Sequence, residues 1–215
     1  MKFNSGKQFE QAPPGSQIAR AYALVDLGTQ PHKFGDKPTT YQRDVRISFE
    51  LPLKKMSGKF DEADKGKIFS VHTTCKQSLH PKANLRKLLE GWRGKKFASK
   101  AETDAFDPKK LLGLTCRLNL IQNEEYTNID SIAALDADER KKVPKQVNAS
   151  VFFSLEPDEF DEKVFELLSD RTKEKIKASP EYAKLTGGEP AGTPDTPVTE
   201  APVGEAPPDD SDQPF

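Results

Sequence analysis

The sequence predicts a mainly β fold with some α-helix, in which a five-stranded barrel carries a helical insertion between its third and fourth strands. Three observations predict this fold class. Several short segments alternate between apolar and polar side chains, which is typical of half-buried strands. One segment with helical periodicity separates the third of these from the fourth. Further helical segments and an acidic tail follow the last strand.

The first three strands are separated by loops rich in Gly, Pro and charged residues. Residues 18–27 are apolar and predict the first strand, and residues 28–40 predict a long loop. Residues 43–51 alternate cleanly between two faces and predict the second strand, which Pro52 is expected to end. Residues 67–75 predict the third strand.

A helical insertion is expected after the third strand. Pro81 suits the first turn of a helix, and Gly94 suits its end. The apolar residues between them recur at i, i+3, i+4 and i+7, which predicts one buried stripe: Leu85, Leu88, Leu89 and Trp92. Two shorter helical turns follow, because Ser99 begins a capping-box pattern and Asp107 precedes a proline.

Two strands complete the predicted barrel. Residues 114–121 alternate and predict the fourth strand, and residues 126–134 predict the fifth. The remaining segments are a charged loop, a short sixth strand and two helices: residues 136–148, 151–155, 160–168 and 170–178 respectively.

Three strands, a helical segment and two further strands form the element order of the OB fold, which binds oligonucleotides on the face of its second and third strands. Other small β-barrels share parts of this order. The prediction has four parts: an N-terminal arm at 1–15, an OB-fold nucleic-acid-binding domain at 16–155, a helical extension at 156–186, and a disordered acidic tail with a protein-interaction tip at 187–215. The extension suits either dimerisation, giving a homo-oligomer, or capping of the barrel.

Opposite charges separate along the chain, although its formal net charge is only −1. Residues 187–215 contain no Lys or Arg and carry seven acidic side chains, so residues 1–186 hold 33 basic and 27 acidic side chains, a net charge of +6. A basic body suits a polyanionic partner. The tail has no aromatic residue before its last position, so it cannot bury enough apolar surface to fold.

Several classes of protein are not expected. The sequence has no stretch of about 18 apolar residues and no apolar signal segment, so we expect a cytoplasmic protein without a membrane partner. The two cysteines form no CxxC pair and the three histidines show no metal-ligand spacing, so no metal or other cofactor is expected. No catalytic motif is present, which makes an enzyme the least favoured class.

Cations interleaved with aromatic rings are the predicted nucleic-acid site, because lysines and arginines neutralise phosphates and rings stack on bases. The candidates are Lys33, Phe34, Lys37, Tyr41, Arg43, Arg46, Lys54, Lys55, Lys59, Phe60, His72, Arg93, Lys95, Lys96 and Arg117 and, with less support, Tyr22 and Tyr126. Phe34, Tyr41 and Phe60 lie in polar loops that no buried stripe explains, so a binding role is favoured. For Arg46, Arg117 and the two Lys-Lys pairs, binding and a merely solvated surface are equally supported.

The last nine residues, 207–215, are PPDDSDQPF. They resemble the acidic C-terminal tip of bacterial single-stranded DNA-binding proteins, in which clustered aspartates precede a final Pro-Phe. The body resembles phage-type single-stranded DNA-binding proteins of the OB fold in residues 23–30, 78–80 and 85–94. A generic acidic tail is the alternative, but it does not explain the terminal aromatic residue.

The resemblance implies a protein that coats and protects single-stranded DNA in phage replication or recombination, in the cytoplasm of the host cell. It also implies that the tip recruits replication, recombination or repair proteins, such as a polymerase, helicase, primase or nuclease. The predicted tip residues are Asp209, Asp210, Asp212, Pro214 and Phe215. The tethered tail would also compete with DNA for the basic body. The alternative is a non-enzymatic protein-interaction adaptor with an OB-like barrel and a solubilising tail.

Overall fold

A computed structural model describes residues 9–123 and 126–188 of the chain. Residues 1–8 of the predicted arm and residues 189–215 of the predicted tail lie outside the described part. The predicted tip therefore also lies outside it: Asp209, Asp210, Asp212, Pro214 and Phe215.

Six strands form one sheet. They are β1 Gly15–His32, β2 Thr40–Lys55, β3 Ile68–Lys76, β4 Thr115–Gln122, β5 Thr127–Ala133 and β6 Val151–Phe153. The first five are neighbours in the order β3, β2, β1, β4 and β5, and each neighbouring pair is antiparallel. β6 lies beside β1 and is parallel to it. The molecule is therefore mainly β, as the alternating segments predict.

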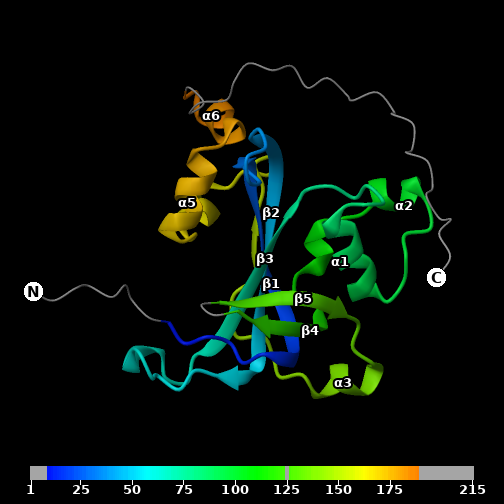
Figure 1. The fold of residues 1–215 in the computed structure, drawn as a ribbon, viewed down its shortest axis with the longest axis vertical. Coiled ribbons are helices and arrows are strands. Elements are labelled where there is room, and N and C mark those ends of the chain that lie inside the picture. The colour runs from blue at the N-terminus through cyan, green and yellow to red at the C-terminus, as the bar shows by residue number, and fades with distance from the viewer. Residues whose placement is uncertain (1–8, 124–125, 189–215) are drawn as a thin grey trace, which may run out of the picture.

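Helices follow the third strand and the fifth strand. The α-helices are α1 Asn84–Arg93, α2 Lys100–Asp104, α3 Ala137–Lys142, α4 Glu162–Glu166, α5 Asp170–Lys177 and α6 Pro180–Thr186. Two 3-10 helices, η1 Glu62–Asp64 and η2 Pro108–Leu111, lie in the loops. Figure 1 shows α5 and α6 at one end of the long β1–β2 hairpin and α3 at the other.

β1 is the longest strand, and it holds the sheet together. Its first residues, Gly15 to Arg20, pair with β4, and the residues from Arg20 to His32 pair with β2. β6 pairs with β1 at residues 23–25, beyond the end of the β4 ladder. One edge of β1 therefore pairs first with β4 and then with β6. The change of partner lies close to a register shift between Ala21 and Ala23 in the pairing of β1 with β2.

The sheet is open, so the predicted closed barrel is not observed. β3 and β5 are the two ends of the strand path, and no hydrogen-bonded ladder joins them in the described part of the chain. A cavity of about 460 Å³ is lined by both strands and by α1. A Cβ atom at Gly91 would lie only 2.6 Å from the carbonyl oxygen of Ile132, so α1 packs directly on the β5 backbone. α1 therefore covers the gap between β3 and β5, which hydrogen bonds between these strands would close in a barrel.

The main hydrophobic core lies between the inner face of the sheet and α1. The ring centroids of Phe49 and Trp92 are 5.3 Å apart, and both side chains are buried. The indole nitrogen of Trp92 donates a hydrogen bond of 3.1 Å to the carbonyl oxygen of Thr115. The prediction that Trp92 belongs to the core is confirmed.

A second core joins the C-terminal helices to the other face of β1. Leu24 belongs to the first core, whereas Val25 and Leu27 belong to the second. The change between Leu24 and Val25 is expected, because successive side chains of a strand point to opposite faces of the sheet. Phe165 of α4 stacks on Tyr182 of α6 with ring centroids 5.2 Å apart. The helices after residue 156 are therefore packed on β1 and β6.

Two strands are longer than the sequence predicts. β1 continues through Gly28, which lies at a register shift with φ of +69° and where a Cβ atom would lie 2.4 Å from Ser179. The predicted loop at 28–40 is therefore only the tip of a hairpin. β2 continues through Pro52, because its ladder with β3 is interrupted between Glu50 and Lys55 and needs no N–H from the proline.

Two helices are not expected from the sequence. The charged segment 136–148 contains α3, because the side chains of Asp136 and Glu139 form a reciprocal capping box. Pro180 ends α5 as predicted but also begins α6, since Ser179 caps that helix and proline suits its first turn. No helix in the described residues is long and apolar enough to cross a membrane.

Candidate nucleic-acid interface

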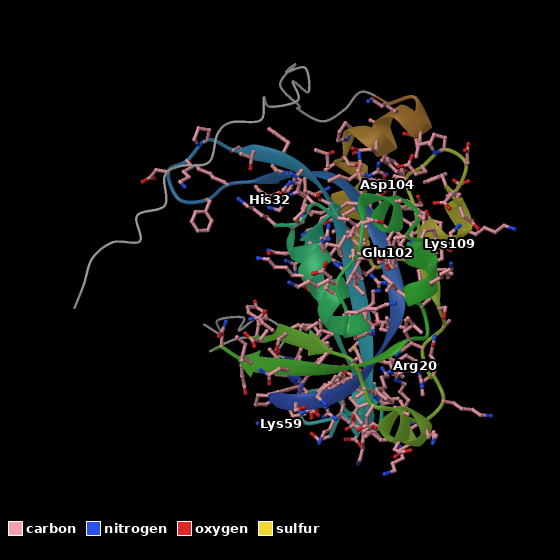
Figure 2. The ribbon with its side chains drawn as sticks, turned by 90° about the vertical axis from the view of Figure 1, so that its right-hand side faces the viewer. Arg20, His32, Lys59, Glu102, Asp104 and Lys109 are labelled. Carbon is pink, nitrogen blue, oxygen red and sulfur yellow. The ribbon has the colours of Figure 1, made fainter. Side chains whose placement is uncertain are left out.

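The tip of the β1–β2 hairpin presents aromatic rings and lysines to solvent. Phe34 is 82% exposed and Tyr41 is 43% exposed, and Lys33 and Lys37 beside them are exposed as well. At the base of the tip, Nε2 of His32 lies 2.8 Å from a carboxylate oxygen of the buried Asp44. The hairpin projects from the body of the molecule in Figure 2, where His32 is labelled. This surface holds four of the predicted site residues together.

A second basic and aromatic surface lies at the other end of β2. Lys54, Lys55 and Lys59 are exposed, and Nζ of Lys59 lies 5.1 Å from the centroid of the Phe60 ring. Figure 2 shows Lys59 at the end of the molecule opposite to His32. A strand of this length spans about 50 Å along its path at about 3.3 Å per residue. The structure therefore divides the predicted loop residues into two separate groups.

The N-terminal arm contacts the loop that carries this second surface. Glu10 accepts hydrogen bonds from the backbone N–H groups of Ser57 and Gly58, and the Ser57 contact lowers its pKa. Gln11 accepts a 3.2 Å hydrogen bond from the N–H of Thr127. The arm thus bridges the β2–β3 and β4–β5 loops. Two exposed rings are chain neighbours of these contacts: Phe9, 61% exposed, precedes Glu10, and Tyr126, 63% exposed, precedes Thr127.

Arg46 and His72 lie on the outer face of β2 and β3. Arg46 is opposite Thr74 and His72 is opposite Ser48, so the two side chains are diagonal neighbours about 7–8 Å apart. His72 is exposed, as predicted. Arg46 is only partly exposed, because α5 covers it and Nη1 of Arg46 donates a 2.9 Å hydrogen bond to Oγ1 of Thr172. The Nε atom of Arg46 is buried without a hydrogen-bond partner among the described residues.

Two cations of α5, Arg171 and Lys175, join this outer face, and neither is among the binding residues predicted from the sequence. Burial lowers the pKa of Arg46, and the positive charge of Arg171 lowers it further. Partial burial lowers the pKa of His72, and so do the charges of Arg46, Lys175 and Arg171. Arg171 and Lys175 are four residues apart in the sequence, which places both on one side of a helix. This spacing is the signal from which the sequence could have indicated the pair.

Three of the arginines predicted to bind nucleic acid form ion pairs with carboxylates of the protein. Arg43 pairs with Asp26, and its Nη1 also lies 2.8 Å from Glu156. Arg93 pairs with Glu102 and lies over the Phe97 ring at 4.2 Å from its centroid. Arg117 pairs with Glu139 and donates a 3.0 Å hydrogen bond to Oγ of Ser16. Each of the three guanidinium groups is therefore held by a carboxylate of the protein, although Nη1 of Arg93 is buried without a hydrogen-bond partner among the described residues. We leave these three arginines out of the proposed interface.

Lys95 and Lys96 follow α1 and are exposed. Neither forms an ion pair with a described residue, so both ammonium groups are available to an anion. They follow α1 in the chain, whereas Phe34 and Phe60 lie in the loops that precede and follow β2.

The structure holds little that suits metal or thiol chemistry. No group of three or more His, Cys, Asp or Glu side chains in residues 9–123 and 126–188 is arranged to hold a metal ion. Burial raises the pKa of both Cys75 and Cys116. Comparison of the chain with protein-family models, curated proteins and solved structures gives no significant match.

Proposed function

We propose that the chain is a single-stranded DNA-binding protein that coats and protects DNA during replication or recombination, without catalytic activity. The observation that carries the proposal is the exposure of Phe34, Tyr41 and Phe60 beside lysines. None of the five lysines beside these rings forms an ion pair with a described residue: Lys33, Lys37, Lys54, Lys55 and Lys59. The proposed DNA path joins the two ends of β2 across the outer face of β2 and β3.

The energetics of exposed rings support this proposal. A Phe side chain left in water forgoes the about 1.5–3 kcal/mol that its burial provides. Stacking of a base on such a ring contributes about 1–3 kcal/mol and requires no particular base. Lysines without ion-pair partners among the described residues are available to neutralise the phosphates that connect the stacked bases. Binding without strong sequence preference is therefore the expected mode.

The strand order supports an OB-type fold as part of the same proposal. β1 lies between β2 and β4, and α1 comes between β3 and β4 along the chain. α1 also covers the gap between β3 and β5, the two strands whose pairing would close a barrel. OB folds bind single strands on the outer face of their second and third strands, which is the face that carries Arg46 and His72 here.

We further propose that the acidic segment 207–215 recruits replication, recombination or repair proteins, with Asp209, Asp210 and Asp212 facing basic residues of the partner. The support is its charge, since residues 187–215 carry seven acidic and no basic side chains. Replacing the three aspartates by Asn should abolish capture of such a partner by the full chain while DNA binding is retained. Undiminished capture would contradict this part of the proposal.

The test of the proposed function is a titration of a labelled dT oligonucleotide with the full chain. Wild-type protein should bind the single strand much more tightly than a duplex of equal length. The F34A/F60A variant should lose at least about tenfold in affinity, because two stacking contacts of about 1–3 kcal/mol each are removed.

A matched control removes an exposed apolar side chain outside these loops. Leu167 is 79% exposed and lies after α4, so Leu167→Ala should leave the affinity for dT unchanged. Equal affinity for single strand and duplex, or an unchanged F34A/F60A variant, would contradict the proposal. The first outcome would favour a protein-interaction adaptor instead.

A further inference from the structure

α5 lies against the outer side of the sheet and is fixed there by two buried side chains. Thr172 and Ile176 are buried, and they lie one helical turn apart on one face of α5. The hydrogen bond between Arg46 Nη1 and Thr172 Oγ1 connects this helix to β2. The side-chain nitrogen of Gln30 donates a 2.9 Å hydrogen bond to the carbonyl oxygen of Lys175, which connects it to β1. The position of α5 on the sheet is therefore well defined.

This position brings four basic side chains together. Arg171 and Lys175 each precede a buried residue of α5 by one position, so they extend from the same edge of the helix. The charge of Arg171 lowers the pKa of both Arg46 and His72, and the charge of Lys175 lowers the pKa of His72. No carboxylate of the described residues forms a salt bridge with any member of the cluster: Arg46, His72, Arg171 and Lys175.

A cluster of like charges is unfavourable in the free protein. Each cation raises the energy of the others, and partial burial of Arg46 increases the repulsion because nearby water is excluded. The chain nevertheless provides acidic partners for other arginines, such as Asp26 for Arg43 and Glu102 for Arg93. An anion bound among the four side chains would remove the repulsion.

We propose that α5 and the outer face of β2 and β3 form a phosphate clamp, in which Arg46, Arg171 and Lys175 bind backbone phosphates of single-stranded nucleic acid. This inference rests on the proposed function and adds to it that the helices after residue 156 are part of the binding site. Thr172 is a positioning residue, since it holds the Arg46 guanidinium toward α5. The clamp lies along β2 between the two exposed aromatic groups.

The test compares two double variants of the full chain that remove the same charge. R171A/K175A removes the α5 half of the clamp. K177A/K184A is the control, because Lys177 and Lys184 are exposed lysines of α5 and α6 outside the cluster. Affinity for a dT oligonucleotide is measured by fluorescence anisotropy at several salt concentrations.

R171A/K175A should weaken binding by at least about tenfold at about 50 mM salt. It should also reduce the slope of log K against log [salt] by about 1.4, since each phosphate contact to a single strand contributes about 0.7. K177A/K184A should leave both quantities close to those of the wild-type protein. Equal effects of the two variants would overturn the clamp.

The melting temperature separates the clamp from a structural role of the same residues. Without DNA, R171A/K175A should melt at a temperature equal to or above that of wild type, because repulsion is removed. If Arg171 and Lys175 served only to hold α5 in place, the variant would melt lower, and this result would overturn the inference. Failure of wild-type protein to bind dT would refute the proposed function itself, whereas wild-type binding with an unaffected R171A/K175A variant refutes only the clamp.

Discussion

Nη1 of Arg46 donates a 2.9 Å hydrogen bond to Oγ1 of Thr172, and this contact joins the second strand of the sheet to a helix 126 positions further along the chain. It places a basic side chain of the sheet beside α5, whose Arg171 and Lys175 are not among the residues predicted from the sequence to bind nucleic acid. The C-terminal helices and the sheet thus form one continuous surface.

Removing this acceptor should affect stability and DNA binding together. In Thr172→Val the Arg46 guanidinium loses its hydrogen-bond partner in a partly buried site, which costs about 1–3 kcal/mol in the free energy of unfolding. Affinity for dT should fall as well, because Arg46 is no longer held toward α5. Urea unfolding and the dT titration measure the two effects. Thr186→Val, which removes a hydroxyl bonded to the carbonyl oxygen of Tyr182 on the surface, should change neither by much.

Binding should become tighter as the pH falls from 7.5 to about 5.5. Burial, followed by the charges of Arg46, Lys175 and Arg171, lowers the pKa of His72 from its ordinary value of about 6.5, so the free protein holds it neutral at pH 7. A phosphate beside it favours the protonated form, so binding takes up a proton. His72→Gln should remove this part of the pH dependence, whereas His80→Gln, outside the cluster, should retain it. Identical pH profiles for wild type and His72→Gln would contradict this prediction.

The same shift predicts how stability depends on pH without DNA. Because the pKa of His72 is lower in the folded protein, the unfolded chain takes up the proton first as the pH falls below about 6.5. The free wild-type protein should therefore lose stability below that pH, and His72→Gln should lose less. Thermal melts of both proteins at pH 7.5 and 5.5 measure the difference.

Glu50 should be among the most sensitive positions for stability. Its carboxylate is fully buried and accepts hydrogen bonds from the backbone N–H groups of Val147 and Asn148, and Arg20 lies 3.5 Å away. Glu50→Ala leaves these N–H donors and the Arg20 guanidinium without a partner, which should cost about 3–5 kcal/mol in the free energy of unfolding. Asp158→Ala, an exposed acid in a turn, should cost little. Urea denaturation that finds the two variants equal would show that Glu50 does not hold segment 147–148.

Gly91→Ala tests the packing of α1 on the edge of the sheet. Alanine favours an isolated helix by about 1 kcal/mol over glycine. Here its Cβ atom would lie 2.6 Å from the carbonyl oxygen of Ile132, so α1 must move away from β5 and the protein should be destabilised. Lys87→Ala, at an exposed position of α1, should leave the unfolding free energy nearly unchanged. A Gly91→Ala protein at least as stable as wild type would contradict this close contact.

The sequence predicts the strands well where apolar and polar residues alternate. Residues 43–51 lie within β2, and the predicted segment 114–121 matches β4, which begins one residue later at Thr115. The stripe that includes Leu89 and Trp92 is buried. The ends of the strands are not predictable from alternation. The bulge at Gly28 and the interrupted ladder at Pro52 depend on neighbours that are distant in the sequence.

The candidate interface is predictable only in part. Phe34, Tyr41 and Phe60 are exposed as predicted, although Tyr41 lies at the start of β2 and not in a loop. The acidic partners of Arg43, Arg93 and Arg117 are not evident from composition, because a free arginine and a paired arginine look alike in a sequence. The four-residue spacing of Arg171 and Lys175 places them on one side of a helix, but that they lie beside Arg46 is known only from the hydrogen bond between Arg46 and Thr172.

The most direct measurement of the central claim is the affinity of the full chain for a labelled dT oligonucleotide and for a duplex of equal length, at about 50 and 200 mM salt. A single-stranded DNA-binding protein should bind dT far more tightly than the duplex at both concentrations, with an affinity that falls as the salt rises. Equal binding of the two forms, or no binding of dT at about 50 mM salt, would contradict the account.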